Sequence, residues 1–133
     1  LAPTAGYLEL VHVALREKLG LLSRDAAVEE AEERAAIARV AEALEARGLP
    51  HDPSDVEEFV ISLHRYLALS PAKLLGISVP DLIGDRRVVN QPGTDKEYPN
   101  WCVPLTGPSG DLVSLEQLTA LPYPRRLARS VTG

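Results

Sequence analysis

One stretch of this sequence, residues 73–79, has the pattern of a buried β-strand. It is short and mostly apolar, and prolines lie close to both of its ends. A nearly continuous apolar run is typical of a parallel strand that is covered on both faces. A parallel strand must pair with neighbours, yet no second run of this kind occurs in the 133 residues. The chain is therefore expected to be mainly α, with at most one or two short strands.

The rest of the chain carries the apolar spacing of amphipathic helices, in which apolar residues recur every three or four positions. Helices are predicted at about 5–22, 24–47, 55–68 and 115–121. Ser54 with Glu57, and Ser114 with Gln117, have the spacing of a capping box, in which the side chains satisfy the first main-chain N–H groups of a helix. These pairs predict where the third and fourth helices begin.

Helices around a single parallel strand make a poor autonomous fold. They are what the closing part of an α/β (β/α)₈ TIM barrel requires, where loops after the strands line the active site. We therefore expect residues 1–133 to be one segment of such a barrel. The loop after its last strand is expected at 88–105.

This loop contains the least periodic part of the sequence, Val-Val-Asn-Gln-Pro-Gly-Thr-Asp-Lys-Glu-Tyr-Pro-Asn-Trp at 88–101. Pro92 and Gly93 predict a tight turn, because proline presets φ and glycine supplies a positive φ at the next position. Aromatic rings pack on the apolar face of a sugar while amides bond its hydroxyls, so the composition suits a carbohydrate site. The plainer interpretation is that these are ordinary loop residues and that the tryptophan only plugs the core.

Two parts of this loop resemble a signature of the amylomaltases, the 4-α-glucanotransferases or disproportionating enzymes of glycoside hydrolase family 77. Residues 1–8, 70–72 and 81–85 also resemble segments of that family. The likeness covers nearly the whole chain but only the last part of the family's full length. The two signature parts are Asn90-Gln91-Pro92-Gly93-Thr94 and Glu97-Tyr98-Pro99-Asn100-Trp101.

The resemblance implies a substrate-binding role for five loop residues. Asn90 is expected to bond a glucose hydroxyl in the donor subsite, and Pro92 and Gly93 to shape the backbone beside it. Tyr98 and Trp101 are expected to stack on the sugar or to support the loop. The alternative for both is that they are buried in the core and have no binding role. The substrate so implied is a maltodextrin or another α-1,4-glucan.

The resemblance also implies which catalytic groups this chain lacks. Retaining glucan transfer uses a nucleophilic carboxylate and an acid/base carboxylate about 5–5.5 Å apart. In the family these lie on earlier barrel strands, and a third essential aspartate would lie immediately before Leu1. No catalytic residue is therefore expected here, and the 133-residue chain alone is expected to be inactive.

Charge, hydropathy and cysteine content argue against several other classes of function. A net charge of −5 and a pI near 5.2 argue against a nucleic-acid surface. No apolar run approaches the roughly 20 residues of a membrane span, and no signal sequence opens the chain, so a cytoplasmic protein is expected. The single Cys102 and three scattered histidines predict no metal site, and no cofactor motif occurs. An exposed apolar face would favour self-association of the isolated segment.

Two other interpretations stay open. A non-catalytic helical module that binds a carbohydrate or a protein would explain the helices and the acidic charge, but not the paired motifs. A small enzyme in its own right is disfavoured because no nucleophile–base constellation is evident.

Overall fold

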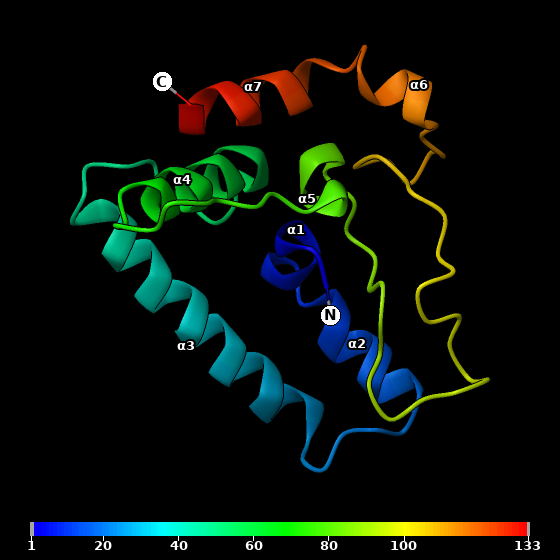
Figure 1. The fold of residues 1–133 in the computed structure, drawn as a ribbon. Coiled ribbons are helices and arrows are strands. Elements are labelled where there is room, and N and C mark those ends of the chain that lie inside the picture. The colour runs from blue at the N-terminus through cyan, green and yellow to red at the C-terminus, as the bar shows by residue number, and fades with distance from the viewer. Residues whose placement is uncertain (1, 133) are drawn as a thin grey trace.

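The structure of the protein, a computed structural model, describes residues 2–132 (Figure 1). Within this range the expected mainly helical fold is confirmed, since the only β feature is an isolated antiparallel bridge between Thr106 and Leu112. The described residues form seven helices: α1 (Thr4–Leu8), α2 (Val11–Lys18), α3 (Ala26–Glu45), α4 (Val56–Ala68), α5 (Val79–Ile83), α6 (Leu115–Leu118) and α7 (Pro122–Thr132).

The strand predicted at 73–79 is wrong. Residues 70–78 form an extended, largely exposed connection, and Leu74 is 92% exposed. Val79 instead begins α5, which Ser78 caps by accepting a hydrogen bond from the Asp81 N–H at 3.2 Å. Pro80 favours this helix start because its fixed φ suits the first turn. With no neighbouring strand among the described residues, the apolar run has nothing to pair with.

The helix predicted at 5–22 is two helices, α1 and α2. Leu10 lies between them in the left-handed conformation, with φ of 59°, and its side chain is only 4% exposed. Burial of this leucine in the core offsets the backbone cost, which is about 1–2 kcal/mol for a residue with a β-carbon. The break turns α2 so that Val13 also reaches the core.

Short polar side chains cap the starts of α3, α4, α5 and α6. The capping box of Ser114 and Gln117 is confirmed, with both of its hydrogen bonds present at the start of α6. The capping box at Ser54 is wrong, because Asp55 is the N-cap of α4 and accepts from the Glu58 N–H. Ser54 instead donates its hydroxyl to Asp52 at 2.7 Å.

The main core lies where α2, α3 and α4 meet. Packing around Phe59, which is 1% exposed, buries aliphatic side chains from α2, from α3 and from the turn after it. Helix α7 covers α4 and α5 on the other side of α4 (Figure 1). The long segment between α5 and α6 has little regular structure and runs past α1 and α2 (Figure 1). The buried members of the core are Leu10, Val13, Ile37, Leu44, Leu49 and Phe59.

Candidate functional site

The motif loop, residues 88–105, is folded back on itself by polar contacts. The Trp101 N–H donates to the Val89 carbonyl at 2.8 Å, which brings the two ends of the 88–101 motif together. The Tyr98 hydroxyl donates to the carbonyl of Val88, whose side chain is 1% exposed. Burial raises the pKa of the Tyr98 hydroxyl, so this donor stays protonated. The contacts give a loop without secondary structure a defined shape.

Asn100 makes the central contacts of the loop. Its Oδ1 accepts from the Gln91 N–H at 2.7 Å, and its Nδ2 donates to the Thr94 hydroxyl at 2.9 Å. The Thr94 hydroxyl in turn donates to the Gln91 carbonyl at 2.7 Å. Asn100 was not among the predicted site residues, although it lies inside the signature motif. Its amide thus ties Asn100 to Gln91, nine residues earlier in the chain, and to Thr94.

The turn predicted at Pro92 and Gly93 is confirmed. Gly93 has φ of 86°, the positive value that a glycine adopts without strain. Both residues are exposed, and the Gln91 side chain donates to the Pro92 carbonyl at 3.0 Å. Asn90, two residues before Pro92, is half-buried. The main chain is held on both sides of Asn90, because the Val89 carbonyl and the Gln91 N–H are both hydrogen-bonded.

Trp101 is the least ordinary residue of the loop. It is 70% exposed, and its backbone is left-handed, with φ of 61°. A bulky residue seldom adopts this conformation, and such outliers cluster at functional sites. The Val89 contact fixes the backbone here, so the indole is presented on the surface instead of filling the core.

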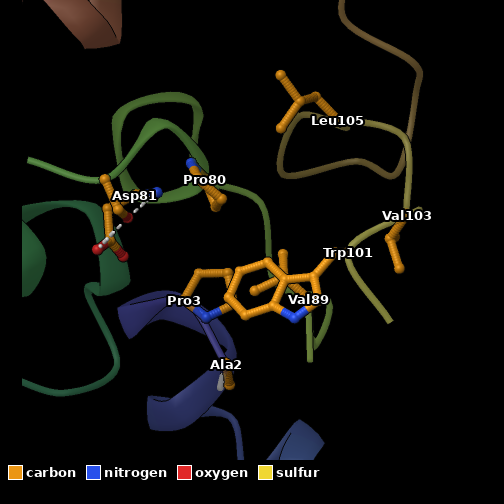
Figure 2. A pocket seen from close by; sticks show the side chains of 9 residues that line it. Ala2, Pro3, Pro80, Asp81, Val89, Trp101, Val103 and Leu105 are labelled. Carbon is orange, nitrogen blue, oxygen red and sulfur yellow. Dashed lines mark hydrogen bonds between the residues drawn. The ribbon is translucent and has the colours of Figure 1, made fainter. Parts of the chain in front are cut away.

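The indole borders a cavity of about 600 Å³. In Figure 2 the ring of Trp101 lies beside Pro3 and Val89, with Val103 and Leu105 along the returning part of the loop. The walls are mostly apolar, with hydroxyl and carboxylate groups on the α5 side. The lining residues are Ala2, Pro3, Ser78, Pro80, Asp81, Val89, Trp101, Val103 and Leu105.

Asp81 joins this cavity to the rest of the fold. Its Oδ1 accepts from the Thr4 N–H at 2.6 Å, at the start of α1. Its Oδ2 accepts from the Ser78 hydroxyl at 2.8 Å. Both oxygens are engaged in holding α1 against α5, which is a structural use of the carboxylate.

A second hollow, of about 490 Å³, lies where the motif loop meets α1 and α2. Tyr7 and His12 stack in it with ring centroids 4.7 Å apart, and Gln91 and Pro92 form part of its wall. The Tyr7 hydroxyl donates to Glu33. This hydrogen bond, with burial and the negative charge of Glu33, raises the pKa of Tyr7 to about 12.

Two carboxylates near the loop, Asp85 and Glu97, accept hydrogen bonds from within the fold. Asp85 is 1% exposed and is bound by Arg87 and by the Thr106 N–H. Glu97 is exposed, and its pKa lies below the usual value because main-chain N–H groups bond to it, that of Asp95 first. A general acid needs a raised pKa instead. The arrangement can bind a ligand through aromatic, amide and main-chain groups.

Residues 2–132 offer neither a metal site nor a membrane span. No group of three or more His, Cys, Asp or Glu side chains in this range is placed to hold a metal ion. No helix described here combines the length and the apolar character that crossing a bilayer requires.

Comparison with known proteins gives one family. The family model described as 4-alpha-glucanotransferase matches residues 1–109. The chain is 48% identical over 120 residues to the 4-alpha-glucanotransferase of Mycobacterium tuberculosis H37Rv, covering 89% of this chain and 17% of that protein. It is 39% identical over 56 residues to the one from Haemophilus influenzae, covering 42% of this chain and 8% of that protein.

A solved structure agrees with these sequence matches. The crystal structure of amylomaltase from Corynebacterium glutamicum superposes with a TM-score of 0.86 and 37% identity, covering 98% of this chain and 20% of that chain. The described fold is thus matched almost from end to end. The chain spans about a fifth or less of the length of the proteins it matches.

Proposed function

We propose, since this chain belongs to the 4-alpha-glucanotransferases of glycoside hydrolase family 77, that its motif loop forms part of a glucan-binding subsite. The chain is then the C-terminal segment of a longer enzyme, which we call the parent enzyme. The parent moves α-1,4-glucan segments between maltodextrins with retention of configuration. The segment contributes the closing part of the barrel and the donor-subsite loop.

The observation that carries this proposal is the exposed indole of Trp101, held in a left-handed backbone at the edge of an apolar cavity. Because the main chain at Trp101 is already held, the ring can stack on the apolar face of a pyranose without ordering of the backbone, which saves conformational entropy on binding. The amide of Asn90 bonds a glucose hydroxyl, and Pro92 and Gly93 set the course of the backbone beside it. Tyr98 supports the loop through its bond to Val88.

The segment binds but does not perform the chemistry. The carboxylates described around the loop hold the fold together or lie exposed at its tip, and a retaining mechanism needs a pair about 5–5.5 Å apart. The nucleophile and the acid/base therefore come from other parts of the parent enzyme. On its own the 133-residue chain is inactive and prone to self-association through exposed apolar side chains such as Leu74.

The test is disproportionation of maltotriose, measured as glucose release, by the 133-residue chain and by the parent enzyme. Activity in the parent alone is expected. Activity in the short chain would contradict the claim that the catalytic carboxylates lie outside it. Asp95 and Glu97 would then be the candidates for these carboxylates. If neither chain is active, a non-catalytic helical module that binds carbohydrate or protein becomes the better assignment.

A second measurement tests the loop itself. In the parent enzyme, Trp101→Ala is expected to raise the KM for maltotriose about tenfold, because loss of one stacking contact of about 1.4 kcal/mol is a factor of ten in binding. Trp101→Phe keeps a ring and should lose less. Leu112→Ala is the control, since Leu112 is 69% exposed and lies outside the motif loop. An unchanged KM in Trp101→Ala would contradict the stacking role.

A further inference from the structure

The motif loop leaves and rejoins the fold at one place, which we call the base clasp: Asp85, Arg87, Pro104 and Thr106. Asp85 is 1% exposed, and its Oδ1 accepts from the Arg87 main-chain N–H at 2.9 Å and from Arg87 Nε at 3.2 Å. Its Oδ2 accepts from Arg87 Nη2 at 3.0 Å and from the Thr106 N–H at 3.0 Å. The Arg87 guanidinium also donates to the Pro104 carbonyl.

The base clasp replaces the main-chain pairing that usually closes such a loop. Among the described residues, a single main-chain hydrogen bond, from Trp101 to Val89, joins the outgoing arm at 85–89 to the returning arm at 101–106. Below this bond is the neck of the loop, where the two arms join the rest of the fold. There the Asp85 carboxylate accepts from the Thr106 N–H, and the Arg87 guanidinium donates to the Pro104 carbonyl. The Asp85 side chain thus joins backbone segments 21 residues apart.

We propose that Asp85 is a positioning residue for glucan transfer, acting through the base clasp to keep Asn90 and Trp101 directed at the same ligand. This inference rests on the proposed function. A carboxylate can accept all four of these hydrogen bonds, because both of its oxygens are acceptors. An asparagine at this position would turn an N–H₂ group toward one pair of donors. Asp85→Asn therefore opens the neck of the loop with almost no change in side-chain volume.

The mechanical part of the proposal is tested without activity. Lys96 is exposed and is the only lysine or arginine within 88–105, so trypsin has one cleavage site inside the loop. In the folded parent enzyme, Asp85→Asn is expected to speed cleavage after Lys96 about tenfold, followed by mass spectrometry. The matched control Asp52→Asn makes the same chemical change at an exposed position before α4, away from the cleavage site, and should leave the rate within about twofold. Equal cleavage rates for Asp85→Asn and the wild type would overturn the claim that the base clasp holds the motif loop.

The positioning part is tested by kinetics with maltotriose. Asp85→Asn is expected to raise KM about tenfold and to change kcat less than about threefold, which is the pattern of lost substrate binding. A variant that was merely less stable would lose active enzyme, which lowers the apparent kcat and leaves KM alone. An unchanged KM with faster trypsin cleavage would overturn the positioning role.

Arg87 supplies the second variant, in case Asp85→Asn folds poorly. Arg87→Gln removes the guanidinium contacts of the base clasp to Asp85 and to the Pro104 carbonyl, so its KM should also rise, and the double variant should lose little more than the worse single one. Additive increases in KM would overturn the claim that Asp85 and Arg87 act as one unit. A wild-type parent that transfers no glucan would overturn the proposed function and the kinetic role with it, while the trypsin rates still decide whether the clasp holds the loop.

Discussion

The main-chain carbonyl oxygen of Arg86 lies where a β-carbon on Gly6 would have to be, since a Cβ built there would come within 1.9 Å of it. The backbone of α1 therefore packs directly on the backbone of the segment that leads into the motif loop. The salt bridge from Arg86 Nε to Glu9 Oε1, at 3.0 Å, holds the same two segments together. This close approach couples the position of α1 to the position of the loop.

Gly6→Ala is expected to destabilise the fold by about 2 kcal/mol. Alanine improves helix propensity by about 1 kcal/mol. Overpacking costs about 1–3 kcal/mol, and the upper end applies because the clashing atom belongs to a backbone that is held on both sides. Urea unfolding followed by circular dichroism measures the difference. Gly76→Ala is the control, since a β-carbon at Gly76 would point into open space and a change within about 0.5 kcal/mol is expected.

A stability no lower in Gly6→Ala than in Gly76→Ala would contradict the backbone contact between α1 and Arg86. A loss confined to Gly6→Ala would support it. The two variants make the same chemical change, so the comparison isolates the space around each glycine.

Trp101→Gly is expected to be more stable than Trp101→Ala by about 0.5–1 kcal/mol. The left-handed backbone at φ of 61° costs a residue with a β-carbon about 1–2 kcal/mol, and glycine avoids that cost. The greater freedom of glycine in the unfolded chain offsets about 0.4–1 kcal/mol. Urea unfolding followed by circular dichroism compares the two variants. An alanine variant as stable as the glycine variant would indicate that this backbone is not strained.

Asn100→Ala is expected to loosen the part of the motif loop between Gln91 and Asn100 without unfolding the helices. The Gln91 N–H loses its acceptor, and a hydrogen bond worth about 1.4 kcal/mol is a factor of ten, so its exchange with solvent should quicken about tenfold. Amide hydrogen exchange followed by NMR measures it. Gln117→Ala is the control because Gln117 belongs to the capping box of α6. Equal protection of Gln91 in both variants would exclude Asn100 as the bridge.

Local signals in the sequence predicted the parts of the fold that short-range chemistry decides. The Pro92–Gly93 turn follows from the restricted φ of one residue and the free φ of the next. Helices α3 and α4 follow from apolar spacing over three turns or more. The apolar run at 73–79 misled because residues 73–78 form a largely exposed connection, and only Val79 belongs to a helix, which Ser78 caps.

Long-range contacts decided the rest. The break at Leu10 depends on the core that buries this leucine, which no local pattern reveals. Asp85 and Thr106 meet only once the chain has folded, so the base clasp left no signal in the spacing of residues. A motif in the sequence named the candidate site residues, but no sequence pattern named the groups that hold the loop around Asn90 and Trp101.

The contribution of Asp85 to stability is expected to depend on pH. Burial alone would raise the pKa of its carboxyl, but hydrogen bonds from Arg87 and from the Thr106 N–H hold the pKa below the ordinary value of 3.8. The unfolded chain therefore takes up a proton at a higher pH than the folded chain does. The stabilisation is complete above pH 3.8 and declines as the pH falls from there through the folded-state pKa.

Asp85→Asn, compared with the wild type by urea unfolding, should reveal this dependence. Breaking one partner of a buried ion pair costs about 3 kcal/mol, so that difference in unfolding free energy is expected at both pH 7 and pH 5. At pH 3 the difference should shrink by about 1 kcal/mol, because each pH unit below the unfolded-state pKa removes up to 1.36 kcal/mol. Other titrating groups cancel in the comparison. A difference that stays constant or grows at pH 3 would mean that the Asp85 carboxylate is not stabilised by the base clasp.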